Sequence, residues 1–169
     1  AEQEFDPADE AQDLEQFGWV LGYGAEFLDP NINIGEGSSV YIVGSMVDLF
    51  EDAEGASGYF NDTLTELSEM AGTTSLGFTT DEVETFGADV GDESAGFDIQ
   101  GSFEDVDGST LDMWFSVLSF RHARLVGSAV FVTFEFEPRS FEDELKGLAS
   151  VMDQRITSVL AGAAVSNQP

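Results

Sequence analysis

The chain has 169 residues, and its 34 Asp and Glu against five Lys and Arg give a formal net charge of -29 at pH 7. This balance excludes nucleic acid and anionic membrane surfaces as partners, because no basic stripe is present to neutralise phosphates. The absence of cysteine excludes disulfides, thiolate nucleophiles and Cys-based metal sites. No apolar run approaches the roughly 18 to 20 residues of a membrane-spanning helix, so direct membrane insertion of this chain is not expected.

The chain opens with AEQEFDPADEAQDLEQ, residues 1–16, an acidic stretch that predicts a solvated N-terminal spacer before the fold. A start at Ala1 without Met is typical of a mature end left after signal-peptide removal, although a trimmed chain would look the same. We therefore expect an extracellular or cell-surface protein.

The first half of the chain predicts two strands and a helix. Residues 17–28 (FGWVLGYGAEFL) mix aromatic residues with glycines and indicate a first strand. Residues 38–49 indicate a second strand that is mostly apolar on both faces, as expected for a strand covered on both sides. An amphipathic helix is expected over 51–71, begun by a capping box at Asp48. The polar, Thr-rich stretch 72–89 predicts a loop that holds at most a short strand.

The second half predicts three strands and a closing helix. An alternating pattern indicates a strand over 97–103. Residues 113–120 and 125–136 are the densest apolar segments of the chain and predict two long strands, joined by a tight turn, at the centre of the sheet. Ser140 is expected to cap a final helix that Gly162 ends.

These elements follow the order ββα-βββα. Hairpin-connected strands favour an antiparallel arrangement, so the predicted fold class is α+β, with a mainly antiparallel sheet of about five strands and two packed helices. The size fits one domain, which we place at residues 17–162, followed by a flexible tail at 163–169.

Four pieces of the chain resemble a known group of proteins. Together they are similar to uncharacterised secreted or lipid-anchored domains of prokaryotes and, more remotely, to extracytoplasmic α/β sandwiches of the PsbP-like fold and some kinase sensor domains. The resemblance spans residues 17–162 and implies a fold and an exported location, but no activity. The pieces are YGAEF with GSSVYIVGSMVDLFEDAEGA, the turn GDES, the hairpin WFSVLSFRHARLVGSAVFVTF and the helix ELKGLASVMDQRI.

The turn of the central hairpin carries three of the six basic side chains of the chain, counting five Lys and Arg and one His. They are Arg121, His122 and Arg124. On so negative a protein, a basic tip reverses the local potential and could orient an acidic partner, which makes it the candidate partner-binding site. The alternative is that these polar residues simply form the turn. As the only histidine, placed between two arginines on a turn, His122 is a poor catalytic base.

A second candidate site is a cation-binding loop. Asp105, Asp107, Ser109 and Asp112 alternate oxygen donors around a glycine, as in a short calcium loop, but they lack the twelve-residue spacing of an EF-hand. The alternative is an ordinary turn, in which Asp and Gly are the expected residues. No other cofactor is expected.

The sequence therefore predicts a non-enzymatic exported domain. It would act through contact with a protein partner or as a homo-oligomer, or as an accessory subunit of a cell-surface assembly. The alternative is a small-molecule or calcium-binding extracytoplasmic module.

The charge balance predicts adaptation to high salt, with an acidic secreted protein as the alternative. Self-repulsion of this many carboxylates destabilises the compact state, and the Debye length falls from about 10 Å at 0.1 M salt to about 3 Å at 1 M. We therefore expect the melting temperature, followed by circular dichroism, to rise as NaCl increases to about 1 M. The rise should be steepest at the low end of that range, where the screening length changes fastest; a flat response would support the alternative.

Overall fold

The computed structural model describes residues 14–28, 39–75, 77–104, 108, 110–134 and 140–162. Within them the chain forms one seven-stranded sheet in the order β1-β2-β7-β6-β5-β4-β3, in which every neighbouring pair is antiparallel. Neither long helix is apolar enough to cross a membrane, within the part of the chain that the structure describes. The strands are β1 (Trp19–Leu28), β2 (Ser39–Phe50), β3 (Thr74–Ser75), β4 (Phe78–Phe86), β5 (Glu93–Glu104), β6 (Thr110–His122) and β7 (Leu125–Phe134), and the helices are α2 (Ala53–Glu69) and α3 (Glu142–Leu160).

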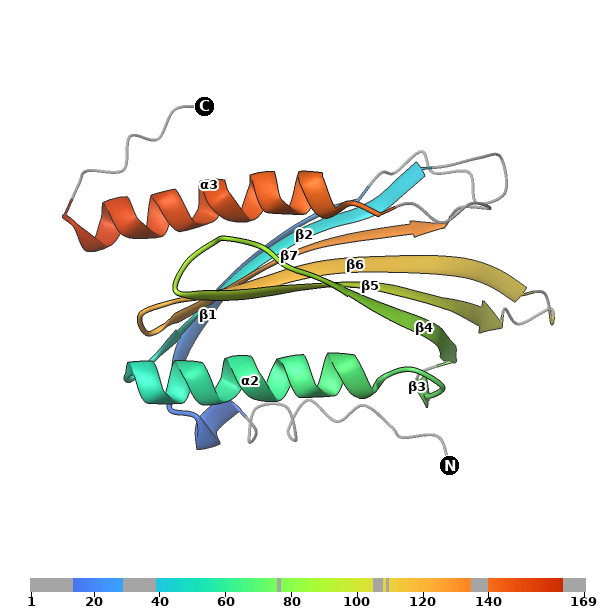
Figure 1. Ribbon diagram of the computed structural model, residues 1–169, viewed down its shortest axis with the longest axis horizontal. Helices are drawn as coiled ribbons and strands as arrows, with labels where there is room; N and C mark the ends of the chain where they lie inside the picture. Colours follow the sequence, from blue (N-terminus) through green and yellow to red (C-terminus); the bar gives the residue numbers. More distant parts are fainter. Residues whose placement is uncertain are drawn as a thin grey trace.

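The two helices pack on opposite faces of the sheet, which gives three layers (Figure 1). Successive side chains of a strand point to opposite faces, so one central strand serves both helices. In β6, Val117 packs in the cluster beneath α2, whereas Leu118 and Phe120 pack with Leu145 and Ala149 of α3. The predicted α+β class and antiparallel sheet are confirmed, and β6 and β7 lie at its centre.

The predicted strand count of about five is too low, because the stretch 72–89 is not a loop. It forms the two-residue β3 and the nine-residue β4. β4 pairs with β5, but the register shifts between Thr80 and Glu82. This bulge interrupts the two-residue alternation on which strand prediction depends, and the exposed acidic residues make the segment look like a loop.

The start of α2 also differs from the prediction. Asp48 does not cap the helix; it lies in β2 with 5% of its surface exposed, where its Oδ1 accepts a hydrogen bond of 3.0 Å from Trp19 Nε1. The N-cap is Asp52, whose Oδ1 accepts from the Gly55 backbone N–H at 2.8 Å.

The start of α3 is shared between two residues. Phe141 occupies the N-cap position with 2% of its surface exposed, and it has no side-chain capping bond. The Ser140 hydroxyl accepts from the Glu142 N–H at 3.3 Å and donates to Asp98 Oδ2 of β5 at 2.6 Å. Ser140 thus lies one residue before the cap position that the sequence predicts for it, and its bond to Asp98 ties the helix to the sheet.

Replacing the cap of α2 tests this correction. We expect Asp52→Ala to lower the free energy of unfolding by about 1 kcal/mol, because the Gly55 N–H loses its acceptor. Asp62→Ala, on the exposed side of the same helix, removes the same charge and keeps every cap bond. Urea unfolding should show a lower free energy of unfolding for Asp52→Ala alone. Equal effects of the two variants would mean that the lost charge, and not the lost cap bond, changes the stability.

Candidate functional site

The predicted basic turn is held by carboxylates of the same chain. Arg121 donates from Nε to Glu93 Oε2 at 3.0 Å, from Nη1 to Asp92 Oδ2 at 3.2 Å, and from Nη1 to the Ala123 carbonyl at 2.9 Å. Only 14% of its side chain is exposed. Asp92 Oδ2 also accepts from the Ala123 N–H at 2.7 Å. The ion pairs therefore join the β6–β7 turn to the turn that precedes β5.

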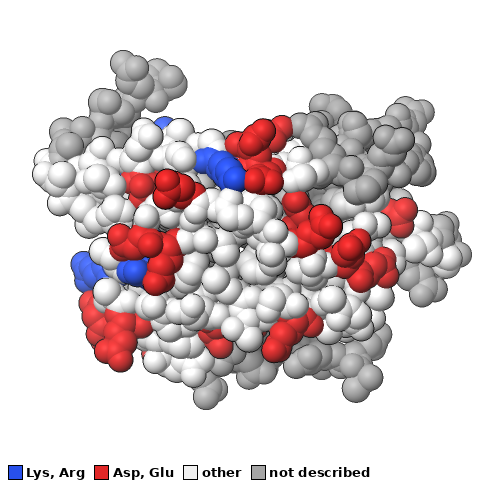
Figure 2. Space-filling view, in the orientation of Figure 1, with Lys and Arg blue, Asp and Glu red and all other residues white. Residues whose placement is uncertain are grey.

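The other two basic residues of the turn also have partners. His122 Nδ1 lies 2.7 Å from Asp153 Oδ1 of α3, and both side chains are 24% exposed. Arg124 is held more loosely: its Nη1 is 3.5 Å from the Glu51 carbonyl. Figure 2 shows carboxylates in separate patches across the visible face, with basic side chains beside some of them. Partner binding by this turn remains a prediction, and much of its charge is already compensated within the chain.

Ala123 explains how this turn closes without glycine. Its φ is 53°, in the left-handed region that glycine adopts far more readily. The Asp92 carboxylate that accepts its N–H helps to hold that backbone in place.

The predicted calcium loop lies mostly outside the described residues, which exclude Asp105, Asp107 and Ser109. Asp112 is described, and it is an exposed residue of β6 opposite Ser102 of β5. Among residues that the structure does describe, no cluster of three or more His, Asp or Glu could hold a metal. Calcium binding therefore remains a prediction.

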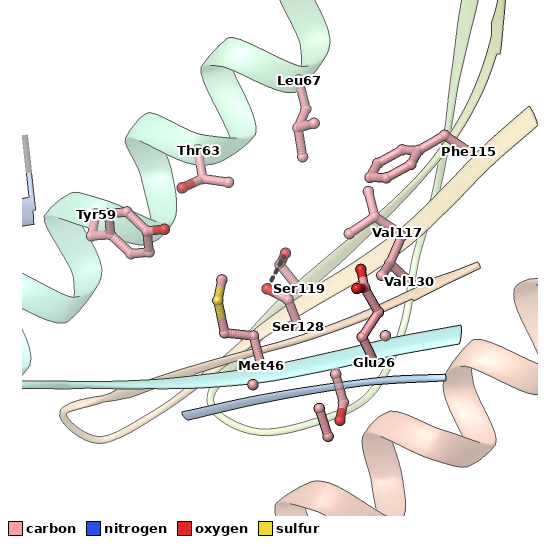
Figure 3. Close-up of a pocket in the computed structure, with 14 residues that line it drawn as sticks. Glu26, Met46, Tyr59, Thr63, Leu67, Phe115, Val117, Ser119, Ser128 and Val130 are labelled. Atoms are coloured by element: carbon pink, nitrogen blue, oxygen red, sulfur yellow. Dashed lines mark hydrogen bonds between the residues drawn. The ribbon is translucent and has the colours of Figure 1, made fainter. Parts of the chain in front are cut away.

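A pocket lies between α2 and the sheet (Figure 3), where the alternative of a small-molecule-binding module requires one, and none of the side chains that line it was predicted as a site residue. Its volume is about 440 Å³, and its walls are mostly apolar. Helix α2 contributes one side and strands β1, β2, β6 and β7 the other. The lining side chains include Tyr59, Thr63 and Leu67 from the helix and Glu26, Met46, Phe115, Val117, Ser119, Ser128 and Val130 from the sheet.

Small residues in β1 and β2 leave the room for this pocket. The register pairs Glu26 with Gly44 and Gly24 with Met46, so glycines alternate with larger residues beneath α2. Gly44 in turn lies opposite Val130 of β7. A Cβ on Gly44 would come within 2.6 Å of Val130 Cγ1, so a larger residue here would displace a wall of the pocket.

Two serines form a polar spot in the pocket. Ser119 and Ser128 are directly opposite each other in β6 and β7, and their hydroxyl oxygens are 3.0 Å apart. One hydroxyl donates to the other, whose own proton remains for a further acceptor. The hairpin strands, which the sequence predicts at the centre of the sheet, thus also supply walls of the pocket.

The edge strand β1 presents large apolar side chains to solvent. Leu21, Tyr23 and Phe27 are 52%, 75% and 70% exposed. All three lie on the face of α3, because their β2 partners alternate with the residues beneath α2. α3 packs on β6 and β7, and it leaves this part of the sheet uncovered. The sole charged residue of β1 is Glu26, whereas β4, near the opposite edge, exposes Asp81, Glu82 and Glu84.

Comparison with known proteins gives a shared fold. No protein-family model matches the chain, and no curated protein matches it. Among solved structures, the extracellular domain of PknH from Mycobacterium tuberculosis is 10% identical, with a TM-score of 0.54 over 85% of this chain and 69% of that one. A protein of unknown function from Pseudomonas aeruginosa, PA94, described as a putative regulator, is 12% identical, with a TM-score of 0.39 over 89% and 87% of the two chains. The resemblance to a kinase extracellular domain is thus confirmed at the level of fold, while the relation to the PsbP-like fold remains a prediction.

The ion pairs at the turn lead to a matched test. Arg121→Gln and Arg124→Gln remove the same charge from the same turn, but only Arg121 is largely buried and held by two carboxylates. We expect Arg121→Gln to reduce the free energy of unfolding by about 1–2 kcal/mol, moderated because both carboxylates are half exposed. Arg124→Gln should stay within about 0.5 kcal/mol of the unmodified protein. Urea unfolding measures both, and equal losses would show that Arg121 has no special structural role.

Proposed function

We propose that this chain is a non-enzymatic exported domain that works by protein contact, and that the contact is pairing of β1 with β1 of a second copy. The observation that carries the proposal is the ten-residue edge strand, which exposes large apolar side chains and holds one charged residue. Long, uncharged, apolar edges are where proteins add further strands, and natural sheets protect such edges with charges when no partner exists.

Strand β1 is complementary to itself. In an antiparallel pair with its two-fold axis through Gly24, Leu21 of one copy lies opposite Phe27 of the other, and both project from the same face. In the same register Glu26 lies opposite Gly22, so neither carboxylate meets a second carboxylate. Cross-strand apolar pairs stabilise a sheet, and like charges directly opposite destabilise it. Two-fold pairing also closes the assembly at two copies.

Other pairings are less favourable. Joining β1 to β4 of another copy would place Glu26 on a seam with exposed Asp81, Glu82 and Glu84, and it would leave free edges for filament growth. A basic protein partner would gain from the net charge of -29, but the nearly uncharged β1 offers it little charge to pair with. The apolar edge therefore favours a second copy.

The non-enzymatic and exported parts of the proposal have separate support. The sole histidine, His122, is bonded to Asp153 at the hairpin turn and does not line the pocket. The PknH domain that shares this fold is extracellular in its own protein, and the acidic composition suits a high-salt exterior.

Light scattering after gel filtration tests the dimer. In about 1 M NaCl we expect a dimer that Leu21→Ser weakens about tenfold or more, because a two-fold contact loses the side chain twice. Leu160→Ser is the matched control, since Leu160 of α3 is 53% exposed against 52% for Leu21.

The salt dependence of binding distinguishes a second copy of the chain from a basic protein partner. Two copies of charge -29 repel, so dimerisation should strengthen as salt rises, whereas a complex with a basic protein should weaken. A chain that stays monomeric at tens of micromolar in high salt, or equal effects of the two serine variants, would rule out pairing through β1.

A further inference from the structure

We infer that the pocket between α2 and the sheet binds a cationic amphiphile, a small molecule with an apolar body and a positively charged head. This goes beyond the proposed contact function, because the pocket lies beneath α2 and the exposed side chains Leu21, Tyr23 and Phe27 lie on the other face of the sheet.

The size and the apolar walls of the pocket indicate the size and polarity of the part of the ligand that would lie inside it. A volume of about 440 Å³ falls within the roughly 300–1,000 Å³ of ordinary small-molecule sites. Val117 and Val130 of the central strands, Phe115 and Leu67 supply apolar contacts on both sides (Figure 3). Each methylene buried among such side chains raises affinity by about fourfold. A short alkyl chain therefore fits the interior.

The serine pair accommodates that chain with a single hydroxyl proton left without a partner. Ser119, 2% exposed, and Ser128 bond to each other at 3.0 Å, so burying an alkyl group beside them breaks no hydrogen bond. The remaining hydroxyl proton can still meet a carbonyl or hydroxyl of the ligand. The pocket interior thus selects for uncharged groups.

Glu26 determines the head group. Its side chain is exposed and projects to the same side of the sheet as Met46 and the serines (Figure 3). None of the described basic residues forms an ion pair with it. A cationic head would gain this carboxylate and the field of a chain with net charge -29, whereas an anionic head would meet repulsion from both. Met46, 43% exposed, can adapt its unbranched side chain to the bound molecule.

Three ligands of equal chain length test the head-group choice. Decyltrimethylammonium and decanoate, each below its micelle concentration, and decanol, below its solubility limit, are titrated calorimetrically into the full chain in about 0.1 M NaCl, where the Debye length is about 10 Å. We expect affinity to fall in that order, with the cation about tenfold or more above decanoate. Glu26→Gln should reduce the ratio of the cation affinity to the decanoate affinity by about threefold. Glu82→Gln on β4, with the same charge change, should leave that ratio unchanged. Equal binding of decanoate, or equal effects of the two variants, would overturn the inference.

Filling the pocket tests its location. Thr63→Phe places a ring between α2 and the sheet and should weaken all three ligands about tenfold or more, with Thr63→Leu as the milder variant should the first not fold. In ¹⁵N spectra of the unmodified chain, ligand shifts should centre on Ser119 and Ser128; shifts centred on the exposed Val159 and Leu160 would overturn the site. Leu21→Ser should weaken the dimer and leave ligand affinity unchanged. The Thr63 variants should weaken ligand binding and leave the dimer unchanged, so failure of one proposal is distinguishable from failure of the other.

Discussion

The pairing of β6 with β7 is the constraint on which the rest of the structure depends. These strands lie at the centre of the sheet, and alternate residues of β6 pack against α2 on one face and α3 on the other. A slip of one residue in their register would exchange the two faces. It would bring Leu118 and Phe120 beneath the wrong helix and turn Ser119 away from the pocket. The register of this one hairpin therefore positions both helices, both cores and the pocket together.

The turn of the hairpin reinforces that register from outside the sheet. Arg121 bonds to Asp92 and Glu93 before and within β5, while His122 bonds to Asp153 of α3. Few basic residues are available in this chain, and two of them are used where three elements meet. In an acidic protein an unpaired carboxylate costs little at the surface, but two carboxylates close together repel. An arginine between Asp92 and Glu93 converts that repulsion into attraction, which explains why scarce positive charge is placed here.

The sequence predicted the features that depend on a local pattern of residues and missed those that depend on how the strands pair. The period of apolar residues located both long helices and the central strands, whereas the bulge of β4 broke the alternation and hid that strand. Arg121 was recognised as unusual, but its partners became known only through the register of β5 with β6. Ser119 and Ser128 were predictable in principle, because they are equally far from the two turn residues and must face each other in a tight hairpin. Glu26 was visible as the one charge of its strand, but nothing local placed α2 above it.

The same strand serves two surfaces of opposite character, because its side chains alternate. On the face of α3, β1 carries Leu21, Tyr23 and Phe27, and on the face of α2 it carries glycines, Glu26 and, at its end, Leu28. The large apolar residues expose apolar surface on the face of α3, and the glycines leave room for the pocket on the face of α2. A large residue at Gly24 would fill the pocket, and a charge at Tyr23 would leave a like charge near its own copy in a two-fold pair. Alternation in a single edge strand thus separates the apolar surface that we propose for contact from the pocket on the other face of the sheet.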